Sequence, residues 1–218
     1  MPQKNFAEKF SALEKFVRDR LADAPGCHDF DHTARVLRNA EAIASAMPEA
    51  DPEIVRCAAL LHDIARPEEL AAGGGICHAA LGAEMTPEIL AGLGFDAAFA
   101  ARVADAVRTH RYRDNANLPE TPEAAVLYDA DKLDSLGAVG IGRAFHFAGR
   151  VGARLHNRAE TALAGREYGR EDTAYREYLV KLSCLKEAML TAAGREMAER
   201  RSAFMDAFFD ELNREAGF

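Results

Sequence analysis

The sequence lacks the features of several large protein classes. No run of about 18 apolar residues occurs among its 218 residues, so no membrane-spanning helix is expected. Strand signals are equally scarce, because no segment sustains an alternation of apolar and polar residues and no Asn-Gly or Asp-Gly turn occurs. We therefore expect a soluble protein without a β-sheet.

A surplus of basic residues is also missing. The formal net charge is −8, which argues against polymeric DNA or RNA as the main partner. A small anionic substrate remains compatible with this charge, because a metal ion and a few arginines can reverse the potential inside one cleft. The oligomeric state is left open by the sequence, with a homodimer as one option.

Cysteine is sparse, and no Cys-x-x-Cys pair is present. The four cysteines are scattered along the chain, as expected of reduced thiols in a cytosolic protein rather than of a cysteine-rich zinc site. The first 16 residues are amphipathic and charged, without the apolar centre of a secretory signal. We expect a cytoplasmic protein.

What the chain has in abundance is helical periodicity, with apolar residues at three- and four-residue steps. The expected helices are 6–21, 30–46, 52–65, 78–91, 96–110 and 121–133, followed by amphipathic stretches at 173–191 and 194–214. Residues 149–170 are basic and glycine-rich, as in a mobile insertion or a surface loop. The prediction is an all-α fold in which residues 1–218 form a single helical bundle.

Histidines and acids gather at the ends of these expected helices. Five of the seven histidines precede residue 111, namely His28, His32, His62, His78 and His110. Imidazole and carboxylate together suit Mn, Fe, Co, Ni or Zn. The chain has no His-Glu-x-x-His and no Glu-x-x-His motif, which argues against a zincin protease and a ferritin-like di-iron bundle.

The stretch ALLHDIA, residues 59–65, places His62 and Asp63 at the end of an apolar helix. Burying these two groups without partners would be costly, so either they satisfy each other or a third group satisfies both. A purely structural pair and a pair that binds a metal ion are both compatible with this stretch alone.

Four segments together resemble the HD superfamily of metal-dependent phosphohydrolases. His32, the His62-Asp63 doublet and Asp131 follow one another in the order of its His…His-Asp…Asp signature. HDFDHTARV and ALLHDIA are similar to its first two motifs, and DADKLDSLGAVGIGRAF is similar to the closing motif of one bacterial and archaeal subgroup. GREMAERRSAFMDAFFDEL resembles the last helix of that subgroup, which includes nucleotide pyrophosphohydrolases.

The resemblance implies a single HD-type domain with a motif core at about 27–145 and C-terminal helices at about 173–214 packed on it. It implies one or two divalent ions, of Mn, Mg, Fe, Co, Ni or Zn, and hydrolysis of a phosphoester or phosphoanhydride of a small molecule such as a nucleotide. The implied metal ligands are His32, His62, Asp63 and Asp131, the last in preference to Asp129. Asp63 and Lys132 are the expected catalytic residues.

Substrate contacts are expected from imidazole and cationic groups beside the motifs. This set comprises His28, Arg35, Arg66, His78, His110 and Arg143. Guanidinium groups match phosphate oxygens bidentately. In members of the superfamily with two ions, histidines in the intervals of His78 and His110 bind the second one, so these two residues can serve either purpose.

Other residues near the motifs have no assigned role. Arg111 and Arg113 follow His110, and each alone is typical of a solvated side chain. Some relatives carry an acid three or four residues after the start of the doublet to orient the attacking water, whereas this chain has Ala65 and Arg66 there. Glu68 and Glu69 lie nearby, and the general base is unassigned.

Two alternatives to hydrolysis stay open. A few HD-fold proteins use the order His…His-Asp…His…His…Asp to hold two irons and oxidise an organic substrate with O₂, and all six residue types occur here in that order. The second alternative is a protein that binds a nucleotide without cleaving it. The cations beside the motifs favour a phosphate substrate over the oxygenase, and the complete ligand set favours an enzyme over the binding protein.

Overall fold

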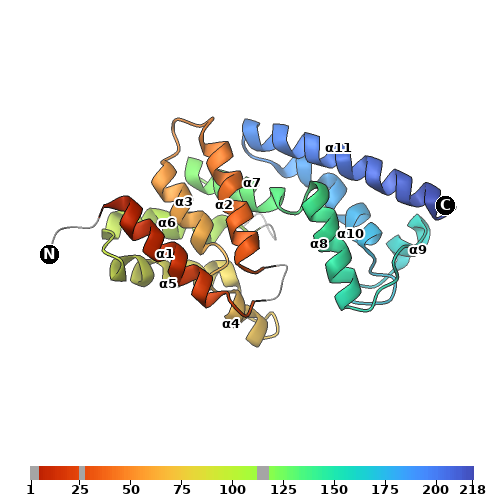
Figure 1. The fold of residues 1–218 in the computed structure, drawn as a ribbon, viewed down its shortest axis with the longest axis horizontal. Helices are drawn as coiled ribbons and strands as arrows, with labels where there is room; N and C mark the ends of the chain where they lie inside the picture. Colours follow the sequence, from red (N-terminus) through yellow and green to blue (C-terminus); the bar gives the residue numbers. More distant parts are fainter. Residues whose placement is uncertain (1–4, 25–27, 112–117) are drawn as a thin grey trace. The chain divides into compact units, whose positions relative to one another are not determined.

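The computed structural model describes residues 5–24, 28–111 and 118–218, and all regular structure within these ranges is helical (Figure 1). The all-α prediction is confirmed. Among the described residues, no helix combines the length and the apolar character needed to cross a membrane. The chain divides into two compact units, residues 1–131 and 132–218, which are described separately.

The N-terminal unit is built around one largely buried helix, α3 (Pro52–Leu61). Its elements are α1 (Phe6–Arg20), α2 (Phe30–Ala44), α3 (Pro52–Leu61), α4 (Arg66–Ala71), α5 (His78–Gly92), α6 (Ala97–Thr109) and most of α7 (Pro122–Leu133). Helix α3 packs against α1, α2 and α6, and its residues from Cys57 to Leu61 have no exposed surface. Polar groups that follow its end therefore enter an apolar environment in which they need partners.

Acidic residues begin three of these helices. The side chains of Asp29, Asp51 and Asp96 accept backbone N–H groups in the first turns of α2, α3 and α6. Such caps satisfy amide groups that have no partner within the helix. Asp29 bonds the backbone N–H of His32 at 3.0 Å, so one of the acids beside the first histidines serves to start α2.

Helix α3 ends earlier than its apolar pattern predicts. It stops at Leu61, residues 62–65 form a turn, and α4 begins at Arg66. The predicted helix 52–65 was thus too long, and α4 was not predicted. Pro67 lies in the first turn of α4, where a missing N–H costs no hydrogen bond. Arg20 of α1 donates from Nε to the carbonyl oxygen of Ile64 at 3.0 Å, which fastens the turn to α1.

The C-terminal unit contains α8 (Gly137–Arg150), α9 (Ala159–Ala164), α10 (Ala174–Val180), the 3₁₀ helix η1 (Leu182–Ala188) and the long α11 (Ala192–Glu215). Helix α11 packs on α8 and η1. The start of α8 needs glycine at one position, because a Cβ on Gly140 would overlap the carbonyl of Ser135. That glycine belongs to the closing motif quoted above.

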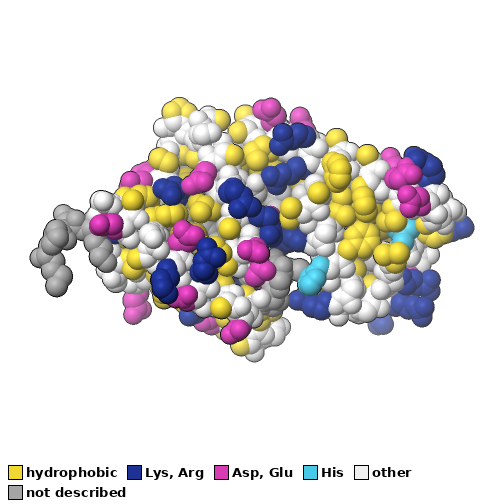
Figure 2. Space-filling model, viewed as in Figure 1, with side chains coloured by type: hydrophobic (Ala, Val, Ile, Leu, Met, Phe, Trp, Pro, Cys, Tyr) yellow, Lys and Arg dark blue, Asp and Glu magenta, His cyan; other side chains and the backbone are white. Residues whose placement is uncertain are grey.

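Two predictions for the C-terminal unit need correction. The stretch 173–191 is not one helix, because Lys181 adopts φ −144° and separates α10 from η1. The segment 149–170 is not wholly loop, since it contains α9. The prediction of one domain across residues 1–218 stays a prediction. On the face shown in Figure 2, basic and acidic side chains are interspersed.

Candidate metal centre

The N-terminal unit collects imidazole and carboxylate groups from six places in the sequence. His28 precedes α2, His32 lies in its first turn, His62 and Asp63 follow α3, His78 begins α5, His110 follows α6, and Asp131 lies in α7. Three overlapping groups have all their ligand atoms within 4.8 Å of one another: His28–His32–Asp63, His32–His62–Asp131 and Asp63–His78–His110. Each of these groups can hold a metal ion.

The first imidazole pair is formed by His32 and His62. Their Nε2 atoms lie 3.2 Å apart, and both rings are fully buried. Asp63 Oδ2 is 3.6 Å from His32 Nε2 and 3.7 Å from His62 Nε2. Asp131 Oδ1 completes the group at 3.5 and 4.0 Å from the same two nitrogens. Four potential ligands thus converge on one position.

The second imidazole pair, His78 and His110, repeats this arrangement on the other oxygen of Asp63. The two Nε2 atoms are again 3.2 Å apart. Asp63 Oδ1 lies 3.2 Å from His78 Nε2 and 3.9 Å from His110 Nε2. The carboxylate of Asp63 therefore faces one imidazole pair with each of its oxygens.

Hydrogen bonds at the far side of each ring indicate which nitrogen carries the proton. The Nδ1 atoms of His62 and His110 lie 2.8 and 2.6 Å from the carbonyl oxygens of Ala59 and Val107. A carbonyl only accepts, so Nδ1 must donate and Nε2 carries the lone pair. His78 Nδ1 makes the equivalent contact with a carboxylate. This arrangement orients metal-binding histidines in proteins.

The geometry between the rings fits a cation. In the His78–His110 pair both Nε2 lone pairs point into the same space, where two neutral acceptors cannot bond each other. Two ligand atoms that share one ion at about 2.1 Å lie about 3.0 to 3.4 Å apart at octahedral or tetrahedral angles. The observed Nε2–Nε2 separation of 3.2 Å falls within this interval.

Burial keeps the second pair neutral. It lowers the pKa of His78 to about 4, although the negative charges of Asp63 and Glu69 act in the opposite direction. Burial is the largest cause that lowers the pKa of His110 to about 3, and the electrostatic interaction with the neighbouring imidazole of His62 acts in the same direction. Both rings are therefore unprotonated near pH 7, as metal ligation requires.

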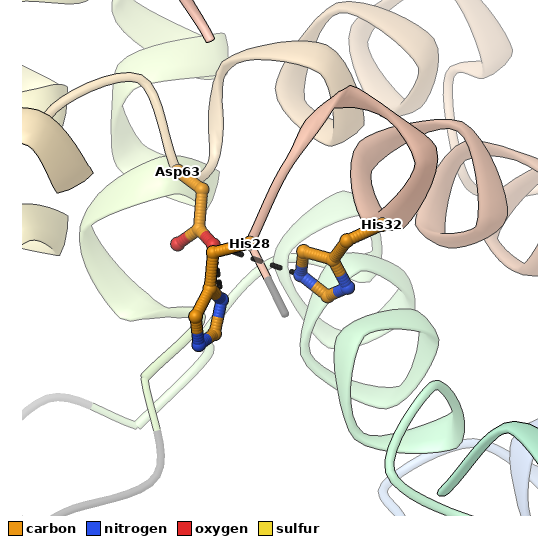
Figure 3. A group of neighbouring side chains, drawn as sticks. All are labelled: His28, His32 and Asp63. Carbon is orange, nitrogen blue, oxygen red and sulfur yellow. Dashed lines mark hydrogen bonds and ion pairs between the residues drawn. The ribbon is translucent and has the colours of Figure 1, made fainter. Parts of the chain in front are cut away.

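Asp63 is ionised despite its burial. Burial by itself raises its pKa, but the electrostatic interactions with His62 and with the Arg66 guanidinium and a hydrogen bond from His28 outweigh that effect and hold the pKa well below its usual value. His28 Nδ1 lies 3.0 Å from Asp63 Oδ2, and Arg66 Nε lies 2.9 Å from Asp63 Oδ1. Figure 3 shows that the imidazoles of His28 and His32 both face the carboxylate of Asp63.

Glu69 lies at the centre, although no role was predicted for it. It is only 6% exposed. Its Oε2 accepts from His78 Nδ1 at 3.0 Å and from Arg66 at 2.7 Å, while Oε1 lies 3.0 Å from Arg111. Burial raises the pKa of Glu69, but the three neighbours lower it by more, so the pKa lies below its ordinary value.

The remaining predicted cations lie in different surroundings. Arg35 is half-buried on α2, one turn after His32, and Lys132 is buried directly after Asp131 in α7. Arg143, in the C-terminal unit, donates to Asp134 at 2.8 Å. Their predicted roles stay predictions. Arg113 lies outside the described residues.

The acids of the segment 128–134 lie in different places. Asp131 approaches the first imidazole pair, and Asp129, although buried, belongs to none of the potential metal groups found among the described residues. Asp134, three residues after Asp131, pairs with Arg143. Of the two later histidines, His146 is exposed and His156 bonds Asn213.

Comparison with known proteins gives consistent matches. A family model described as HD domain matches residues 29–136. The uncharacterized protein YpgQ of Bacillus subtilis (strain 168) is 33% identical over 209 residues, which span 93% of this chain and 91% of YpgQ.

Solved structures also match this chain over most of its length. The crystal structure of Bacillus subtilis YpgQ in complex with ADP has a TM-score of 0.73 at 29% identity and covers 96% of both chains. A predicted HD superfamily hydrolase from an uncultured Thermotogales bacterium has a TM-score of 0.67 at 32% identity, covering 94% of this chain and 91% of its own.

Proposed function

The chain belongs to the HD-domain family, and from that premise we propose that it is a divalent-metal-dependent phosphohydrolase of a small molecule, namely a nucleotide. The observation that carries the proposal is the position of Asp63, whose two oxygens each face a pair of buried imidazole nitrogens. A buried ionised carboxylate among neutral imidazoles is a site for cations.

In this proposal His32, His62, Asp63 and Asp131 hold one ion. His78 and His110, with the second oxygen of Asp63, hold another. The alternative for the second pair, direct contact with phosphate, requires a donor at Nε2. The hydrogen bonds at Nδ1 favour the acceptor form instead, which supports a second ion.

Divalent ions at such positions neutralise phosphate oxygens and lower the pKa of bound water, which helps an in-line attack on phosphorus. The side chains perform the remaining tasks. Asp63 links the two imidazole pairs, and the bonds at Nδ1 fix the directions of three rings. Lys132 and Arg35 supply positive charge next to Asp131 and His32 in the chain, where a phosphate would be bound.

A nucleotide is the favoured substrate for two reasons. The relative YpgQ was crystallised with ADP, so a fold of this kind accommodates an adenine nucleotide in that protein. In this chain, guanidinium groups of Arg66 and Arg111 lie beside the second imidazole pair. Cations near a metal centre suit a polyanionic phosphate better than an uncharged substrate.

A second candidate is a di-iron oxygenase, which the same six ligands around one shared carboxylate would also permit. It differs from the first in two measurable properties. Its turnover would consume O₂, and it would release no phosphate from any nucleotide.

The test uses metal-free full-length protein reconstituted in turn with Mn²⁺, Mg²⁺, Co²⁺, Ni²⁺ and Fe²⁺. Each form is assayed for phosphate and pyrophosphate release from nucleoside mono-, di- and triphosphates, with and without O₂. We expect metal-dependent release that is independent of O₂ and falls by about 10³-fold or more in Asp63→Asn, because several kcal/mol of charge stabilisation are lost.

Two outcomes would contradict the proposal. O₂-dependent turnover of an iron-loaded protein without phosphate release would identify the oxygenase. Tight nucleotide binding without turnover under any metal would identify a binding protein. Glu14→Gln, on the exposed surface of α1, is the matched carboxylate control and should retain full activity.

A further inference from the structure

His78 differs from the two other histidines with a known orienting contact. His62 and His110 each directly follow a helix, so their Nδ1 atoms reach the carbonyl oxygen three residues earlier. His78 is instead the first residue of α5, with no helical turn before it. His78 therefore has no helical carbonyl three residues earlier to bond. Its Nδ1 bonds the carboxylate of Glu69 in α4 instead, at 3.0 Å from Oε2.

The same carboxylate lies between two guanidinium groups. Arg66 and Arg111 both contact Glu69, at 2.7 and 3.0 Å. Arg66 also donates to Asp63 Oδ1, which is the oxygen that faces His78. Without Glu69, two positive charges would stand beside a position meant for a cation and would repel it.

Building on the proposed function, we propose that Glu69 is a positioning residue that prepares the second ion site. It performs two tasks, since it keeps His78 in the form with a lone pair on Nε2 and it offsets the charges of Arg66 and Arg111. Groups that orient metal ligands in this way change metal affinity by about 10- to 100-fold when they are removed. His32, His62 and Asp131 form a separate potential metal group, and the ion that this group would hold should not depend on Glu69.

Two substitutions separate the two tasks. In Glu69→Gln the amide oxygen can still accept from His78, but the negative charge is lost. In Glu69→Ala both the acceptor and the charge are lost. We expect the second ion to bind about 10-fold more weakly in the first variant and about 100-fold more weakly in the second.

The experiment is a calorimetric Mn²⁺ titration of metal-free full-length protein, with bound Mn²⁺ counted by electron paramagnetic resonance. Wild-type protein should bind two ions per chain, and both Glu69 variants should retain the first ion at wild-type affinity. Glu68→Gln is the matched control, because Glu68 is the neighbouring acid on α4 and contacts Arg20 of α1. It should bind two ions as the wild type does.

Three results would overturn the inference: a wild-type protein that binds fewer than two ions, Glu69 variants that bind both ions normally, or variants that weaken both ions equally. Retained first-ion affinity shows that a variant is folded. The readout is separate from hydrolysis. A Glu69-dependent second ion in a protein that cleaves no nucleotide would contradict the proposed function and support this inference, whereas hydrolysis with a Glu69-independent ion count would do the reverse.

Discussion

The two imidazole pairs of the centre have the same internal spacing but different surroundings. In each pair the Nε2 atoms lie 3.2 Å apart beside one oxygen of Asp63. The first pair is completed by Asp131, a second negative ligand. The second pair has no further carboxylate in its potential ligand group, and the guanidinium of Arg66 touches its Asp63 oxygen.

This difference should give the two positions unequal affinities. Two carboxylates attract a divalent ion more strongly than one carboxylate that is shared with a guanidinium. The imidazoles of both pairs are buried, but the first position also has Asp131, whose side chain is 27% exposed. We expect the first position to hold the tighter ion and to meet the substrate, and the second to hold the weaker, more deeply buried one.

Replacing one histidine of each pair in turn should give the largest difference between the two positions. We expect His62→Asn to remove the first ion and to lower kcat by about 10²- to 10³-fold, because the ion nearer to the exposed side is lost. His110→Asn should retain one ion, and its kcat should fall by only about 10-fold. Steady-state kinetics with metal analysis measures both. Equal losses in the two variants would show that the pairs are equivalent.

In the metal-free protein, the pH dependence of stability tests whether the second imidazole pair is neutral. The pKa values of His78 and His110 are lowered to about 4 and about 3, below the ordinary value of 6.5 in the unfolded chain. Between about pH 6.5 and 4 the unfolded chain therefore binds protons that the folded protein does not. Stability should decrease as the pH falls through this window, by about 2 kcal/mol from pH 7.5 to 5.5.

Urea unfolding in the presence of a chelator measures this decrease. His110→Asn should reduce it, because one of the two depressed groups is gone. His146→Asn is the control, since His146 is exposed, and it should leave the decrease unchanged. A pH-independent stability of the wild-type protein across this range would mean that the second pair is not kept neutral by burial.

The smallest expected effect concerns the cation that follows Asp131. Lys132→Met keeps the length of this buried side chain and removes its charge. If Lys132 contacts a phosphate beside the first position, KM for the nucleotide should rise about 10-fold. Lys15→Met, on the exposed face of α1, is the matched control. An unchanged KM in Lys132→Met would remove this residue from the site.

The resemblance to the HD motifs named the residues of the centre in advance, and the structure brings His32, His62, Asp63 and Asp131 close together. The His62-Asp63 doublet follows α3, and Asp131 rather than Asp129 approaches the first pair. The puzzle of a polar doublet at the end of an apolar helix is resolved by partners drawn from α2, α5, α6 and α7.

Glu69 could not be predicted, because its burial depends on α4. The predicted helix 52–65 left no room for a second helix, whereas Pro67 lies in the first turn of a new one. That short helix turns Glu69 toward His78 and two arginines. An acid six residues after Asp63 is no signal by itself, since the chain path between them decides what it meets. The break at Lys181 could not be predicted either, because no proline or glycine marks the end of α10.

The most direct test of this account is to locate the ions. Crystals of the full-length protein grown with Mn²⁺ would be measured at the manganese absorption edge, where anomalous scattering reveals each ion. The account predicts two peaks, one on each side of the Asp63 carboxylate, with the stronger peak between His32, His62 and Asp131. A single peak away from Asp63, or none at all, would contradict it.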